Sequence, residues 1–181
     1  AKLLAWHADG HTMHCAGEHY GYARQSSGSV HRRAVLFVSP DTWLVVDRIS
    51  GSGARHVRLH WQAGPFAYTR EDERVALETP AGRFGVAVYD AAAQPLSIEV
   101  VEGATEPLRG WLARTYGRKV AAPSMSGDVE ADGPVTLISL LGEGTLYAEN
   151  GTRYRLETPR GAVALSIVDG LISLRHSEVV A

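Results

Sequence analysis

The sequence predicts an all-β domain, an antiparallel β-sandwich with very little helix. Short runs rich in Val, Ile, Leu, Phe and Trp recur along the chain, and turn-forming Gly, Pro, Asp and Ser residues separate them. No stretch of about 12 residues keeps the i, i+3, i+4, i+7 apolar stripe of an amphipathic helix. The nearest candidate, 108–119, is interrupted by Gly110 and Gly117.

Eight apolar runs are the predicted strands. In chain order they are 30–38, 43–49, 57–62, 84–89, 96–101, 135–141, 162–168 and 171–174. In the first run both sets of alternating side chains become apolar toward the end, which predicts a strand inside a packed sheet with its basic start near an edge. Asp169-Gly170 between the last two runs suits a two-residue type I′ turn, so these runs are expected to form a hairpin.

The third run separates an apolar set of side chains from a polar set. The apolar set is Val57, Leu59 and Trp61, and the polar set is His56, Arg58 and His60. Because successive side chains of a strand point to opposite faces, the first set is expected in the core and the second at the surface. The polar set is a candidate lining for a groove that binds an acidic sugar, with Trp61 excluded from it by the alternation.

Composition predicts one globular domain over residues 1–181. Of these residues 45% are hydrophobic and 21% charged, and the formal net charge is -2. This balance lacks the basic excess of a nucleic-acid-binding protein. No run approaches the roughly 18 apolar residues of a membrane span, and the single Cys15 excludes an internal disulfide.

Five of the eight histidines lie within the first 31 residues. The spacing of His7, His11 and His14 invites a metal site, because imidazoles are good zinc ligands. Gly10 and Gly17 disfavour the helix that would bring the three together, and on one strand His14 would face away from the other two. Exposed or hydrogen-bonded histidines are the favoured interpretation.

The segment 18–22, Glu-His-Tyr-Gly-Tyr, combines a carboxylate, an imidazole and two phenols, the groups that proton transfer requires. Packing of aromatic side chains around a turn is the simpler interpretation. His31-Arg32-Arg33 at a strand start is either an anion-binding group or an edge-strand charge cluster. Asp47, directly after an apolar run, needs a partner, which Arg48 or Arg32 could supply, and a structural salt bridge is favoured over a ligand role.

Several motifs in order resemble one known family. They are the segments 19–24, 30–38, 44–51 and 56–61, then Gly110-Trp111 and Tyr116-Gly117-Arg118-Lys119, followed by Ala122-Pro123. Together they resemble the C-terminal β-sheet domain of heparinase II/III-like polysaccharide lyases, over roughly residues 15 to 145. The resemblance implies a supersandwich-like fold that forms the second part of a larger enzyme, after an N-terminal α/α-toroid domain.

The resemblance also implies an activity, β-elimination at a uronic acid of an acidic polysaccharide. It makes Tyr22 and His19 the candidate catalytic residues, while Arg33, Arg58 and His60 are the candidate substrate-binding residues. His31 is the candidate ligand of a structural zinc or other divalent metal of the larger enzyme, whose other ligands would precede Ala1. A periplasmic or secreted location is implied as well.

The chain alone is expected to be nearly inactive, because much of the family's catalytic set comes from the toroid. The alternative function is a noncatalytic carbohydrate-binding β-sandwich module, and a structural domain of a cell-envelope protein is a third. Exposed Trp43, Trp61 and Trp111 in a row would favour the binding module, whereas buried tryptophans would favour the lyase scaffold.

Overall fold

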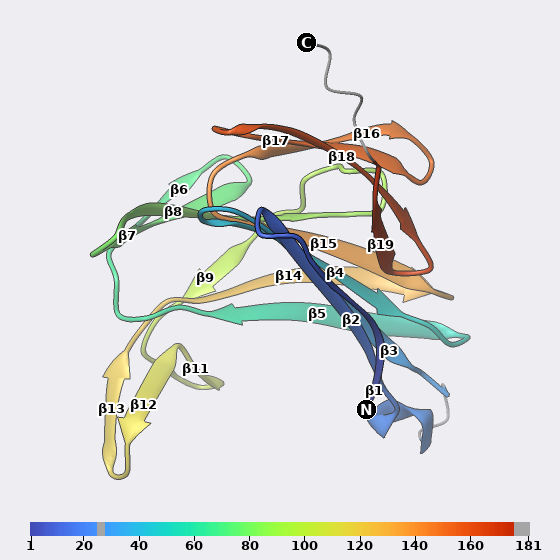
Figure 1. Cartoon of the computed structure of the whole chain (residues 1–181). Coiled ribbons are helices and arrows are strands. Elements are labelled where there is room, and N and C mark those ends of the chain that lie inside the picture. The colour runs from blue at the N-terminus through green and yellow to red at the C-terminus, as the bar shows by residue number, and fades with distance from the viewer. Residues whose placement is uncertain (25–27, 176–181) are drawn as a thin grey trace.

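The computed structural model describes residues 1–24 and 28–175, which form nineteen strands and one short 3-10 helix, η1 (Gly21–Arg24) (Figure 1). The all-β prediction is confirmed, and every pair of neighbouring strands is antiparallel. In these two ranges no helix is long and apolar enough to cross a membrane.

An eight-stranded sheet forms the middle of three layers. In spatial order its strands are β1 (Lys2–Ala8), β2 (Thr12–His19), β3 (His31–Val38), β4 (Thr42–Ile49), β15 (Val135–Leu141), β8 (Gly82–Tyr89), β7 (Arg74–Thr79) and β6 (Tyr68–Glu71). The β3 strand lies between two neighbours, as its apolar faces predict, but the expected place of its basic start near an edge is wrong, because residues 31–33 pair with both β2 and β4.

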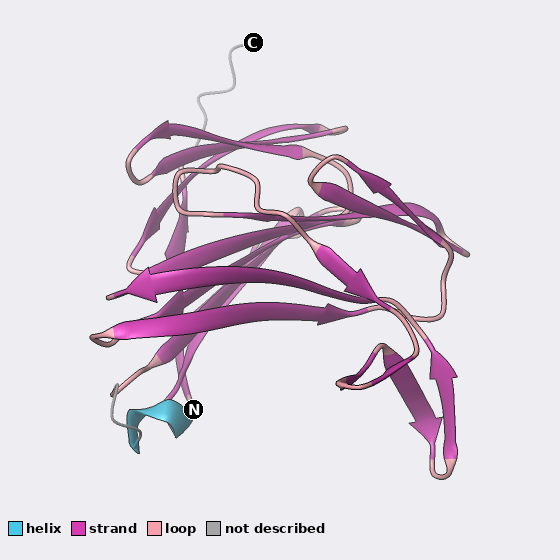
Figure 2. Ribbon diagram, turned by 180° about the vertical axis from the view of Figure 1, so that it is seen from behind, coloured by secondary structure: helices cyan, strands magenta, loops and turns pink. Residues whose placement is uncertain are grey.

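A smaller sheet covers each face of this middle layer (Figure 1). One has the order β16 (Thr145–Asn150), β17 (Arg153–Thr158), β18 (Gly161–Val168), β19 (Leu171–Leu174), and the other has the order β5 (Ala54–Gln62), β14 (Ser124–Asp132), β9 (Glu99–Val101). Two short ribbons are the pair β10 (Ala104–Thr105) and β11 (Leu108–Arg109) and the hairpin of β12 (Trp111–Thr115) and β13 (Arg118–Ala121). The β12–β13 hairpin projects away from the layers (Figure 2).

Two apolar cores separate the three layers, and successive side chains of one strand of the middle sheet point alternately into the two cores. On β15, Ile138 and Leu140 point into the core beneath β16–β19, where Leu156 and Leu165 are fully buried. Leu137 of the same strand points into the other core. The middle sheet is therefore apolar on both faces where both outer sheets cover it.

Each of the eight predicted runs contains a strand. The run 57–62 begins earlier, at Ala54, and of the run 96–101 only Glu99–Val101 is a strand. The predicted last hairpin is confirmed, since Val168 pairs with Leu171 and the turn residues Asp169 and Gly170 have φ of 52° and 74°. The segment 108–119 contains strands and no helix.

The expected placement of the early histidines is wrong in one respect. A turn at Gly10, whose φ is 87°, divides the segment into β1 and β2, so that His7 pairs with His14 across the hairpin. Their ring centroids lie 5.4 Å apart. The face assignment failed because it treated the segment as one continuous strand, whereas directly paired residues of two strands share a face.

Candidate functional site

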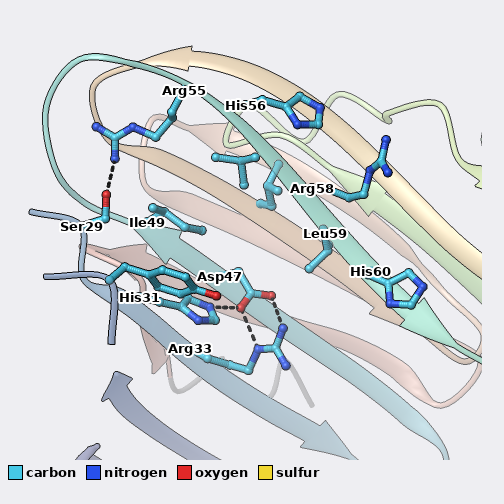
Figure 3. Close-up of a pocket in the computed structure, with 13 residues that line it drawn as sticks. Ser29, His31, Arg33, Asp47, Ile49, Arg55, His56, Arg58, Leu59 and His60 are labelled. Atoms are coloured by element: carbon cyan, nitrogen blue, oxygen red, sulfur yellow. Dashed lines mark hydrogen bonds and ion pairs between the residues drawn. The ribbon is translucent and has the colours of Figure 1, made fainter. Parts of the chain in front are cut away.

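A hollow of about 380 Å³ lies between the middle sheet and β5 (Figure 3). Its lining comes from η1, β3, β4, β5 and β15 together with Ser29, and consists of Tyr22, Ser29, His31, Arg33, Asp47, Ile49, Arg55, His56, Val57, Arg58, Leu59, His60 and Leu137. The odd-numbered residues of β3 and β4 turn toward β5, because the even-numbered ones fill the core under β16–β19. Strand alternation thus places polar side chains in the hollow.

Asp47 lies at the bottom of this hollow, with only 2% of its side chain exposed. Arg33 donates to both carboxylate oxygens, at 2.7 Å from Nε and 2.9 Å from Nη2, and His31 Nε2 lies 2.5 Å from Oδ1. A buried carboxylate requires such charge-assisted partners, and the planar fork of Arg matches it with two parallel bonds. His31, Arg33 and Asp47 are called the Asp47 cluster below.

The predicted structural salt bridge of Asp47 is present, but its partner is Arg33, so the two expected partners, Arg48 and Arg32, are wrong. The β3–β4 register pairs Arg33 with Asp47 and Arg32 with Arg48, so those two arginines lie on the opposite face of the sheet. There Arg32 and Arg48 pair with other acids, at 3.4 Å and 3.1 Å. Closeness in the sequence suggested these partners, but even-numbered and odd-numbered residues of β3 and β4 point to opposite faces of the sheet, which excludes them.

Burial by itself would raise the pKa of Asp47. Hydrogen bonds from His31 and Arg33, together with the charges of both groups, outweigh it and hold the pKa of this carboxyl below its ordinary value. Asp47 is therefore ionised in neutral solution and serves as the internal counter-ion of the hollow.

Positive charge exceeds negative charge in the lining. Asp47 is the one carboxylate among the lining residues that the structure describes, against the two inward-facing guanidiniums of Arg33 and Arg55, while the third lining arginine, Arg58, pairs with an acid on the outer face of β5. The side chain of Arg33 is 42% exposed, and its guanidinium lies 5.4 Å from the ring centroid of Trp61. Arg33 therefore holds Asp47 while leaving part of its guanidinium open to solvent, and an anion is the ligand that this charge balance favours.

The two candidate catalytic residues lie near each other. The ring centroids of His19 and Tyr22 are 6.0 Å apart in an edge-on arrangement, and the His19 Nδ1 accepts a hydrogen bond of 3.3 Å from the Gly21 amide. Tyr22 is 50% exposed and lines the hollow with His31 and Arg33, whereas His19 is not among the lining residues. The structure therefore brings Tyr22, but not His19, to the Asp47 cluster.

Arg58 and His60 border the hollow but direct their polar groups to the outer face of β5. Arg58 Nε donates to Asp128 at 2.7 Å, and His56 Nε2 lies at the same distance from this carboxylate. His60 Nε2 bonds to the hydroxyl of Ser124. The predicted alternation along β5 is confirmed, and it separates these two candidate substrate-binding residues from Arg33.

A family model described as Heparinase II/III-like, C-terminal, matches residues 2–139. The chain belongs to this family. A search of curated protein sequences gives no match. Among solved structures the heparinase-like chain is similar to the "Heparinase III-BT4657 gene product", with 20% identity, and to heparan sulfate lyase HepC from Pedobacter heparinus, with 16% identity. In each case the TM-score is 0.67 and 96% of this chain is covered.

The heparinase-like chain spans 27% of the length of either of these two solved relatives. At such low identities the similarity establishes the fold, a supersandwich-like arrangement of sheets, and it assigns no role to a residue. The roles of the individual residues therefore depend on the geometry described above.

The metal-ligand role of His31 in the heparinase-like domain stays a prediction. His31 Nε2 faces Asp47, but both oxygens of Asp47 already accept hydrogen bonds from the Arg33 guanidinium. Over residues 1–24 and 28–175, no group of three His, Cys, Asp or Glu side chains comes together to hold a metal. These residues alone do not fit a divalent ion, which would require further ligands from elsewhere in a larger enzyme.

Two arginines of the heparinase-like domain make contacts that the sequence did not predict. Arg55 is in phase with the apolar set of β5 and faces inward, where it bonds Ser29 and the carbonyl of Ser50. The alternation would have shown this, but the predicted strand began at residue 57, three residues after the start of β5. Arg109 approaches Ser124 from β11, and no sequence pattern indicates this contact.

The imidazole of His60 is expected to titrate below its ordinary range. Burial, followed by the charges of Arg109 and Arg58, lowers its pKa. The unfolded chain therefore binds a proton more readily, so the stability that this group contributes is present above its unfolded pKa of about 6.5 and is lost as the pH falls below it. NMR titration of His60, assigned by comparison with a His60→Asn variant, measures this, and a midpoint at or above the ordinary value would contradict it.

Proposed function

We propose that this chain is the C-terminal β domain of a polysaccharide lyase that cleaves uronate-containing acidic polysaccharides by β-elimination. The observation that carries the proposal is the hollow beside the Asp47 cluster. Its one described carboxylate is already paired with Arg33, which keeps an exposed edge. A guanidinium edge in such a place suits a carboxylate or sulfate group of an acidic sugar.

In the proposed reaction the residues of the hollow have different roles. In β-elimination a base removes the proton at C5 of the uronate, a C4=C5 double bond forms, and the bond from C4 to the leaving oxygen breaks as that oxygen gains a proton. Arg33 would neutralise the carboxylate and so acidify the C5 proton. Tyr22, exposed at the hollow with a phenolic hydroxyl, is the proposed proton-transfer group, and the proposed role of His19 rests on the family resemblance.

A further apolar surface supports the idea that the domain works within a larger enzyme. Four large side chains share the face of β1–β4 that carries Asp47: Leu3, Trp6, Met13 and Trp43, exposed by 68%, 67%, 39% and 37%. Apolar side chains gathered on one face are typical of an interaction surface. An N-terminal α/α-toroid domain is the proposed occupant, and a periplasmic or secreted location is part of the same proposal.

The alternative, a noncatalytic carbohydrate-binding module, has less support. Its expected signature is a row of exposed tryptophans, but Trp43, Trp61 and Trp111 lie on three different sheets. Trp61 and Trp111 are half-buried and donate hydrogen bonds to Ser139 and Ala104. The positions of these three rings therefore favour the lyase scaffold.

The proposal predicts that elimination needs more than the 181 residues. The chain alone and the natural polypeptide that contains it would be incubated with heparan sulfate and with alginate, and the unsaturated uronate followed by ultraviolet absorbance. We expect turnover by the longer polypeptide only, and a drop of about 100-fold in its kcat for Tyr22→Phe. The matched control is Tyr20→Phe, 44% exposed and two residues away, which should leave kcat unchanged.

Two results would contradict the proposal. One is rapid elimination by the 181-residue chain alone, and the other is the absence of elimination by the longer polypeptide on any uronate-containing polysaccharide. Equal activity of the Tyr22→Phe and Tyr20→Phe variants would remove Tyr22 from the proton transfer.

A further inference from the structure

The β12–β13 hairpin projects from the layered body, on the side of the molecule where β5 and β14 lie (Figures 1 and 2). We propose that this hairpin is an arm that binds a polyanionic sugar chain, at a site separate from the hollow. The inference goes beyond the proposed function, because the arm can bind such a chain whether or not the hollow takes part in elimination.

Charge is the first observation. Residues 107–127 contain no Asp or Glu, although the whole chain carries a net charge of -2. Arg114, Arg118 and Lys119 are exposed on the hairpin, and none of the three has an ion-pair partner in the part of the chain that the structure describes. Several other surface arginines of the domain pair with acids, as Arg58 does with Asp128, whereas Arg153, Arg160 and Arg175 have no ion-pair partner among the described residues but belong to the other side of the layered body. Arg118 and Lys119 are consecutive in β13 and therefore point to opposite faces of the ribbon. Three unpaired cations on so short a ribbon, without an acid beside them in the sequence, favour a polyanion.

Aromatic rings accompany these cations. Tyr116 lies at the tip of the hairpin, fully exposed, and the Lys119 ammonium lies 4.0 Å from the centroid of the Trp111 ring. An exposed ring offers an apolar surface to the face of a pyranose, while the cations meet its carboxylates or sulfates. The combination of both groups on one ribbon indicates an acidic sugar chain more specifically than charge alone.

The base of the hairpin is held in place by Arg109, which precedes it. Its side chain is 13% exposed, its Nη1 lies 2.5 Å from Glu99, and its other nitrogens donate to the hydroxyls of Ser124 and Ser126 at 2.9 Å and 2.8 Å. Gly110 follows with a φ of 76°, and its carbonyl accepts the amides of Gly103 and Ala122, both at 2.9 Å.

This anchoring explains why an isolated two-stranded ribbon keeps its place. Two strands alone are marginally stable in water, so the contacts of Arg109 and Gly110 add stability that the pairing within the hairpin does not provide. An arm with a fixed base loses less conformational entropy when it binds than a free loop would. The hairpin therefore presents its cations and its tip ring in an arrangement formed before the ligand arrives.

The test is calorimetric titration of the 181-residue chain with heparin oligosaccharides, with neutral dextran as the comparison ligand. The variant replaces the three cations together, Arg114→Gln, Arg118→Gln and Lys119→Gln. A matched control replaces Arg153, Arg160 and Arg175 with Gln, since all three are exposed and have no ion-pair partner among the described residues. Circular dichroism melting shows whether each variant is folded.

We expect heparin to bind the unmodified chain and dextran not to bind. The hairpin variant should bind heparin about tenfold more weakly, with a smaller salt dependence, and the control variant should bind as the unmodified chain does. Tyr116→Ala should weaken binding with an unchanged salt dependence, because it removes an apolar contact and no charge.

Four results would overturn the inference. They are no binding of heparin, equal losses in the hairpin and control variants, an unchanged affinity of the hairpin variant, and equally tight binding of a duplex DNA. None of these bears on whether a longer polypeptide eliminates uronates, so the failure of the arm and the failure of the proposed lyase activity are distinguishable.

Discussion

Replacing Asp47 with Asn is expected to lower the free energy of unfolding by about 3 kcal/mol, because the change leaves Arg33 and His31 without the carboxylate that compensates them. The side chain keeps its size, so the loss reports charge and hydrogen bonding rather than a cavity. Urea unfolding followed by tryptophan fluorescence measures it.

The same substitution should change the pH dependence of stability. The folded pKa of Asp47 lies below its unfolded value of about 3.9, so the stabilising contribution is present above that value and is lost as the pH falls through the folded pKa. The unmodified chain should therefore lose stability below about pH 4 more steeply than the Asp47→Asn variant.

Asp128→Asn is the matched control. Asp128 also accepts hydrogen bonds from an arginine and a histidine, but its side chain is 33% exposed. Solvent screens such a pair, and we expect a loss below about 1 kcal/mol. Equal losses at Asp47 and Asp128 would show that burial does not determine the importance of the Asp47 cluster.

The second large effect is expected at Gly142, in the turn that leads from the middle sheet to β16. Its φ is 100°, and a Cβ there would overlap the carbonyl oxygen of Asp41 and lie 3.1 Å from the Cα of Thr42. Both obstacles are backbone atoms, which cannot rotate away. Gly142→Ala should therefore add a packing cost of about 1 to 3 kcal/mol to the backbone strain of its φ.

Gly133→Ala separates these two contributions. Gly133 has a φ of 104°, nearly that of Gly142, but nothing lies within 4 Å of the position of its Cβ. This variant should show the strain alone, about 1 to 3 kcal/mol. Chemical denaturation of both variants gives the comparison, and equal losses would mean that the Asp41–Thr42 backbone moves to make room.

The sequence predicted best what depends on local alternation. The two faces of β5 and the Asp169-Gly170 hairpin both follow from a few consecutive residues, and both are confirmed. The β1–β2 hairpin was not predicted, since its histidines and small residues lack the apolar runs that mark a strand. Periodicity also missed β7, β14 and β17, which contribute buried residues to the two cores, so it finds strands with long apolar runs more readily than strands of mixed composition.

The composition of the Asp47 cluster could not be predicted in the same way. The need of Asp47 for a partner was recognised, but its choice of Arg33 follows from the register between β3 and β4, which one strand alone does not contain. The contact of Arg109 with Ser124 likewise depends on how a separate ribbon folds back onto β14. Such pairings appear only when the spatial order of the strands is known.

The position of Asp47 on β4 also protects the fold against misalignment. Its neighbour Val46 is fully buried in the core beneath β16–β19, while Asp47 points to the other side. A slip of β4 by one residue would exchange the two and place an ionised carboxylate in that apolar core, far from Arg33. The charge thus disfavours the misaligned sheet in the folding chain, in addition to stabilising the correct one.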